Sequence, residues 1–103
     1  MLSQRTFRHL IFLLCLLALP AIAQAQAQSS RAESAASYYN RGNEWFHKGE
    51  LDRAVADYTL ALTFDPKLVD ALINRGHIQW RKGDLDAALA DFTKAIEDRK
   101  SVV

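Results

Sequence analysis

The feature that most constrains the fold is an internal repeat. When residues 35–68 are aligned with residues 69–102, twelve of the thirty-four positions are identical, and "HKGELDRAVADYTLAL" in the first unit becomes "RKGDLDAALADFTKAI" in the second. A period of this length corresponds to one small supersecondary unit, which cannot bury its own apolar face alone. The chain is therefore predicted to fold as two stacked copies of one unit.

Each unit is predicted to contain two helices. Apolar residues recur at intervals of three and four over residues 51–62 and again over 85–96. At 100° per residue these positions form one stripe, the signature of a helix with one buried face. Gly49 and Gly83 precede the stripes, where a left-handed residue ends the preceding helix, and Pro66 stops the helix between the units. The prediction is an all-α fold with four helices in two hairpins.

The period and the residues of both units resemble the tetratricopeptide repeat family. That family favours a large residue, a glycine and an aromatic residue in its first helix, and alanines, an aromatic residue and a proline later on. The matching positions are Tyr38, Gly42, Trp45, Ala54, Tyr58, Ala61 and Pro66 in the first unit, and Leu72, Gly76, Ala88, Phe92 and Ala95 in the second. The second unit departs from the pattern at Gln79, where an aromatic residue is usual, and at Lys100, which replaces the proline.

The resemblance covers about residues 35–100 and implies a short right-handed α-solenoid. We expect a repeat domain at 34–103, with repeats at 35–68 and 69–102. Gly42 and Gly76 are expected to let the two helices of each hairpin approach closely. Because such arrays usually need at least three units, we also expect the last helix to be partly covered by a second copy or by a partner.

Residues 1–23 have the organisation of a secretory signal peptide. A short basic segment precedes the apolar run "LIFLLCLLAL", and Pro20 and the small-residue segment "AIA" follow it. This order predicts cleavage after Ala23, with Ala25 and Ala27 as alternative sites. The competing interpretation is an uncleaved membrane anchor, although the apolar stretch is shorter than the ~20 residues that a bilayer span needs.

The mature chain predicted from this cleavage has no cysteine and a nearly balanced charge. Residues 24–33, which include "QAQAQSS", are expected to form a flexible polar leader. Cys15 is discarded with the signal peptide, so no disulfide holds the domain together. Eleven basic and twelve acidic residues remain, with the two signs interspersed. Nucleic acid and anionic lipid are therefore not expected partners.

No residues support catalysis or a cofactor. His47 and His77 are too few and too far apart in the sequence for a metal site of three or four ligands. Asp57 and Asp91 are equivalent positions of the repeat, which we interpret as solvated helix faces rather than as paired catalytic carboxylates. We expect neither an enzyme nor a metal or cofactor site.

The resemblance places the first helix of each hairpin on a concave surface. The partner-binding residues that it implies there are Tyr39, Asn43, Phe46, Asp70, Ile73, Asn74, His77 and Trp80. Phe46 and Trp80 occupy equivalent positions, and they either anchor a partner or pack between neighbouring helices. Some relatives bind a terminal carboxylate with Lys and Asn; we reject that mode because Tyr39 stands where the Lys is needed.

These expectations combine into an exported protein-interaction module, periplasmic or secreted, that binds a peptide or helix of unknown identity in its groove. Two alternatives stay open. One is a self-associating structural protein, such as a homodimer; the other is a membrane-tethered accessory subunit, if the N-terminal apolar segment is not cleaved. No stable membrane insertion is expected after cleavage.

Overall fold

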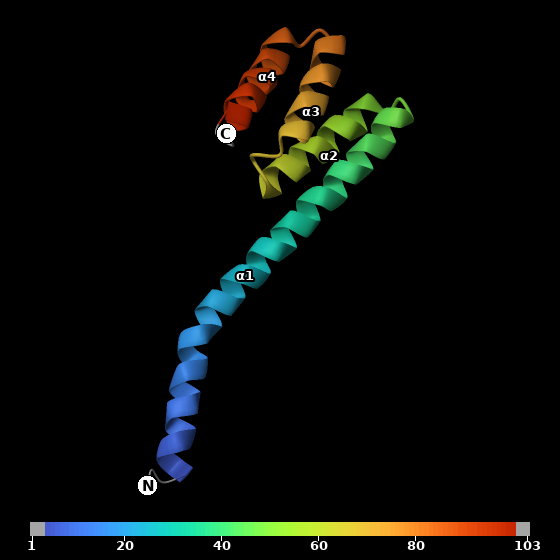
Figure 1. Ribbon diagram of the computed structural model, residues 1–103. Coiled ribbons are helices and arrows are strands. Elements are labelled where there is room, and N and C mark those ends of the chain that lie inside the picture. Colours follow the sequence, from blue (N-terminus) through green and yellow to red (C-terminus); the bar gives the residue numbers. More distant parts are fainter. Residues whose placement is uncertain (1–3, 101–103) are drawn as a thin grey trace. The chain divides into compact units, whose positions relative to one another are not determined.

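The computed structural model describes residues 4–100, with side chains from residue 21 onward. The helices are α1 (Gln4–His47), α2 (Leu51–Phe64), α3 (Val69–Arg81) and α4 (Leu85–Lys100) (Figure 1). No strand occurs within 4–100. The chain divides into two compact units, and the one that begins at Arg31 contains both hairpins. The all-α fold with two tandem hairpins is confirmed, whereas the first residues of the predicted signal peptide and the end of the second repeat lie outside the described residues.

Helix α1 is longer than the sequence pattern suggested. We expected residues 24–33 to form a flexible leader, but the structure has them in the helix, with exposed side chains. The physical reason is local composition. This segment holds no glycine or proline and is rich in alanine and glutamine, which are good helix formers. The polarity of a segment is therefore not sufficient to predict that its backbone is irregular.

The turn inside each hairpin is built on a left-handed glycine, as expected. Gly49 and Gly83 have φ angles of 76° and 84°. The amide of Gly49 donates to the Phe46 carbonyl at 3.0 Å, and the amide of Glu50 donates to the Trp45 carbonyl at 2.9 Å. The second hairpin repeats both bonds at the equivalent residues. This paired closure satisfies carbonyls that a helix end would otherwise leave free.

The two helices of each hairpin pack where a glycine faces an aromatic ring. A Cβ atom on Gly42 would lie 2.7 Å from Tyr58 Cε1, and one on Gly76 would lie 2.9 Å from Phe92 Cε1. Tyr58 is fully buried, so its ring fills the space over Gly42. The predicted close approach is confirmed in both repeats. The surrounding core cluster consists of Ala54, Tyr58, Leu62, Ala71, Leu72, Ile78 and Ala95.

An arginine–aspartate pair also joins the helices of each hairpin. Arg41 donates to the two carboxylate oxygens of Asp57 at 2.7 and 2.8 Å, and Arg75 binds Asp91 in the same bidentate way at 2.8 and 2.7 Å. Both carboxylates are buried. The interpretation of these aspartates as solvated was wrong, because each is covered by the arginine that lies sixteen residues earlier in the sequence.

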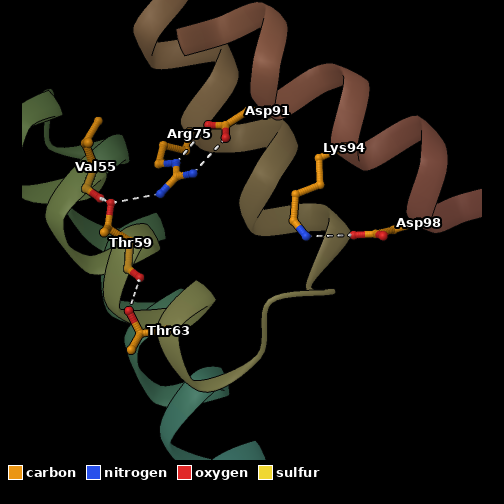
Figure 2. A network of polar contacts seen from close by, with 7 residues as sticks. All are labelled: Val55, Thr59, Thr63, Arg75, Asp91, Lys94 and Asp98. Carbon is orange, nitrogen blue, oxygen red and sulfur yellow. Dashed lines mark hydrogen bonds and ion pairs between the residues drawn. The ribbon is translucent and has the colours of Figure 1, made fainter.

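Arg75 additionally connects the two hairpins. Its Nη1 atom donates to the Thr59 hydroxyl at 3.1 Å, and that hydroxyl donates to the Val55 carbonyl at 2.7 Å (Figure 2). One guanidinium on α3 thus contacts α2 of the first repeat and α4 of its own repeat. Gln79, which stands where the family usually has an aromatic residue, has its side-chain amide beside the Asp91 carboxylate. With its nitrogen facing Asp91, that amide donates at 2.9 Å.

The apolar stripe of α4 is only partly buried, contrary to the expectation of one buried face. Ala88 and Ala95 are covered, but the side chains of Leu85, Leu89 and Ile96 are 59, 66 and 57% exposed. In the first repeat, α3 covers the corresponding stripe of α2. Among the described residues no helix covers α4 in the same way, so the periodicity of α4 predicted the helix correctly but not the burial of these three residues.

The Gly42 contact predicts that a glycine-to-alanine substitution destabilises the first repeat more than the second. Gly42→Ala should lower the free energy of unfolding by about 1–2 kcal/mol, because overpacking against the buried Tyr58 ring outweighs the higher helix propensity of alanine. Gly76→Ala is the matched control and should cost less, since Phe92 is only partly buried and its ring can move. Urea denaturation measures both values. A Gly42→Ala protein as stable as wild type would contradict the close contact.

The Asp57 pair predicts a pH dependence. The hydrogen bond from Arg41 lowers the pKa of the Asp57 carboxyl, and the charge of Arg41 adds to this, although burial opposes it. Because the folded-state pKa lies below the unfolded value of about 3.9, the pair stabilises the fold above that value. The contribution is lost as the pH falls through the folded-state pKa.

Asp57→Asn should therefore lower the urea midpoint at neutral pH and reduce the loss of stability between about pH 5 and 3. Glu97→Gln, which removes the same charge from an exposed position of α4, is the control. The role of the pair would be refuted if both variants lost stability with acid as steeply as wild type.

Candidate functional site

Helices α1 and α3 carry all eight predicted partner-binding residues, and three of these form one row of rings. The ring centroids of Phe46 and His77 are 6.3 Å apart, and those of His77 and Trp80 are 6.2 Å apart, with the latter two rings stacked at 19°. We call Phe46, His77 and Trp80 the aromatic row. It crosses from the first repeat to the second and provides a continuous ring surface along the C-terminal halves of both helices.

The members of the aromatic row differ in burial. Phe46 is partly buried and packs against the core cluster, whereas His77 is exposed and Trp80 is 58% exposed. Phe46 therefore packs between the neighbouring helices, as one of the two interpretations held. Trp80, at the equivalent position of the second repeat, leaves more than half of its side chain accessible for contact with another molecule.

A hydrogen-bonded network lies beside the aromatic row. The Tyr58 hydroxyl donates to Asn43 Oδ1 at 2.6 Å, and Asn74 Nδ2 donates to the same oxygen at 3.3 Å and to the Tyr39 hydroxyl at 3.4 Å. Burial raises the pKa of the Tyr58 phenol, so this group remains a neutral donor at physiological pH. The network joins α1, α2 and α3.

The network changes the role of three predicted binding residues. Tyr39, Asn43 and Asn74 are partly buried and use polar atoms for bonds between the helices. Such bonds fix the spacing of α1 and α3, and with it the spacing of the rings. These residues thus position the surface, and their contact with a partner stays a prediction. Sequence reasoning missed the network because Tyr58 comes from the other helix of the hairpin.

The remaining two predicted residues lie apart from the aromatic row. Asp70 is exposed in the first turn of α3, seven residues before His77 and hence about 10 Å from it along the helix axis. Ile73 is partly buried and packs against the core cluster. It also borders an apolar hollow beside α4. The structure therefore unites six of the eight predicted residues in the aromatic row and the network.

Two cationic side chains lie near Trp45, which the sequence analysis named only as a match to the family pattern. The Lys48 ammonium and the Arg53 guanidinium lie 5.1 and 4.7 Å from the centre of the Trp45 ring. Contacts of this kind are attractive because the face of an indole carries negative charge density. They hold the turn of the first hairpin against α2, which is a structural role.

The described residues offer neither a metal-binding cluster nor a membrane-spanning helix. Within the described part of the chain, no three His, Cys, Asp or Glu side chains are grouped so that they could hold a metal ion. In that same part, no helix combines the length and the hydropathy that crossing a membrane requires.

Comparison with known families agrees with the repeat geometry. Two family models, each described as a tetratricopeptide repeat, match the chain at residues 35–68 and 69–97. No curated protein sequence matches the chain significantly. Tetratricopeptide repeats are protein-interaction modules and in general non-enzymatic scaffolds. With two matched repeats, glycine–aromatic hairpins and an exposed ring surface on its first helices, this chain belongs to the tetratricopeptide repeat family.

Proposed function

We propose that this chain is an exported interaction module that holds a peptide or a helix in the groove between α1 and α3. The observation that carries this proposal is the aromatic row, and above all the exposed ring of Trp80. Large aromatic residues supply much of the binding energy at protein interfaces, because they bury a large area with few rotatable bonds. Trp80 is the main anchor, and His77 extends the ring surface toward Phe46.

The hydrogen bonds around this surface support the same function. The network of Tyr39, Asn43, Tyr58 and Asn74 joins three helices, and Arg75 joins the hairpins on another side. A surface that is already ordered loses little conformational entropy on binding, which raises affinity for a given contact area. We therefore expect the partner to be an apolar segment that packs on the aromatic row.

Export is the second part of the proposal. It rests on the order of a basic segment, an apolar run and small residues in the first twenty-three positions. Cleavage after Ala23, Ala25 or Ala27 would release a chain without cysteine. Such a chain suits an oxidising compartment, since its fold depends on packing and hydrogen bonds rather than on the state of a thiol.

Trp80→Ala should separate binding from folding. Peptides selected from a displayed random library against the wild-type protein should bind Trp80→Ala at least about tenfold more weakly. The free energy of unfolding should fall by less than about 1 kcal/mol, because most of this side chain is already exposed. Leu60→Ala, an exposed leucine on α2, is the matched control and should keep wild-type affinity.

Isothermal titration and urea denaturation give the two quantities. If the selected peptides bound both variants equally well, binding would lie outside the aromatic row. If stability and affinity fell together, Trp80 would be a core residue rather than an anchor.

Intact mass of the protein from the exported fraction tests the signal peptide. The expected mass corresponds to a chain that begins at Gln24, Gln26 or Gln28, because small residues precede each of these positions. A chain of full length recovered with the membrane fraction would contradict cleavage and support the tethered subunit instead.

A further inference from the structure

The outer face of α4 is apolar and accessible. Leu85, Leu89 and Ile96 lie within about 40° of one another around the helix axis, and each side chain is more than half exposed. We call these three residues the α4 face. Single exposed apolar residues are common on protein surfaces, whereas several on the same face of one helix are typical of an interaction site.

The first repeat shows what kind of structure fits such a face. The equivalents of the α4 face are Leu51, Val55 and Leu62, which are buried or partly buried in the core cluster. Helix α3 contributes Ala71 and Ile78, both fully buried, to the same core cluster. The α4 face is therefore shaped to receive a helix, as the same face of α2 does in this structure.

The start of the array does not provide that helix. In α1 the positions equivalent to Ala71 and Ile78 are Ser37 and Glu44, and both are exposed. A second copy that continued the solenoid through α1 would place a carboxylate and a hydroxyl on the leucines, which is unfavourable without polar partners. Head-to-tail stacking of copies is thus disfavoured.

The α4 face is instead complementary to itself. Its two leucines lie in the first half of the helix, while an apolar hollow of about 340 Å³ lies beside the second half, lined by Ile73, Phe92, Ala95, Ile96 and Arg99. When two α4 helices pair in antiparallel orientation, the leucines of each copy lie over the hollow of the other. This is the geometry of a two-fold interface, in which the same patch serves both copies.

The charges agree with the antiparallel orientation. Asp86 lies in the first turn of α4 and Lys100 in the last, both exposed, and both are on the same flank of the α4 face. The register that places Leu89 over Ile96 of the second copy also places Asp86 beside Lys100 of that copy. In a parallel two-fold pair this flank would face the opposite flank of the second copy, so Asp86 and Lys100 would not be paired.

We infer that the α4 face is the contact between two copies of this chain, paired through antiparallel α4 helices. This interface is separate from the groove of α1 and α3, so it does not rest on the proposed function. A pair of sixteen-residue helices buries less than a standard interface, so the dimer is weak, with a dissociation constant on the order of 10 μM.

Sedimentation equilibrium on the purified protein, with its N-terminus identified by intact mass, tests the interface. Wild type should show a monomer–dimer equilibrium. Leu89→Lys should raise the dissociation constant at least about tenfold, because each dimer loses two buried leucines. The matched control is Leu60→Lys, which removes an exposed leucine of α2 at the position where the second repeat already has Lys94. It should change the constant less than about twofold.

A charge exchange tests the orientation. Asp86→Lys and Lys100→Asp should each weaken the dimer, and the double variant should restore it, because each end then regains one pair of opposite charges. Circular dichroism confirms that the variants keep their helices.

Three results would overturn the inference. These are a monomer at all concentrations up to about 100 μM, a dimer that Leu89→Lys and Leu60→Lys affect equally, or a double charge variant no better than the single ones. A wild-type monomer whose α4 face is protected only by an added partner protein would assign the face to another chain.

Discussion

The contact between Gly42 and the Tyr58 ring is the constraint on which the rest of the structure depends. Because no Cβ separates them, the ring reaches far enough for its hydroxyl to meet Asn43 on α1. Asn43 in turn receives the amide of Asn74 from α3. Close packing inside the first hairpin thus helps to position the second hairpin through these hydrogen bonds. The position of the second hairpin in turn sets the spacing between the rings of the aromatic row.

The two repeats are similar in fold and different in what they leave exposed. Both keep the glycine–aromatic contact and the arginine–aspartate pair. They differ where each meets its neighbours: the first repeat presents Ser37 and Glu44 on its outer side, and the second presents Leu85 and Leu89. In repeat arrays a polar outer face is typically exposed to solvent, whereas an apolar face is typically covered by a neighbouring helix. The two surfaces that we propose as interaction sites, the aromatic row and the α4 face, therefore lie on different helices.

Prediction from the sequence succeeded where the signal is local. The glycine turns depend on a few consecutive residues, and the hairpins depend on a period that is visible in the chain itself. It failed where the answer depended on residues distant in sequence. Asp57 was interpreted as solvated because the arginine that covers it lies on another helix. The flexible leader expected at residues 24–33 differs from the structure for a local reason instead: the segment has no glycine or proline, is rich in good helix formers and lies within α1.

The sequence by itself determined the repeat, the four helices and the hairpin turns, because these follow from periodicity and from the backbone freedom of glycine. The family resemblance added a prediction of eight partner-binding residues. Only the tertiary structure decided which of those residues face solvent. Phe46 and Trp80 occupy the same repeat position, yet one packs against the core cluster and the other is largely exposed. Val55 and Leu89 are likewise equivalent positions of the apolar stripe, and they differ in burial because α3 covers the outer face of α2, whereas no helix within the described residues covers the outer face of α4. Burial depends on what is packed next to a residue, and the repeat pattern is the same whether or not a neighbour is present.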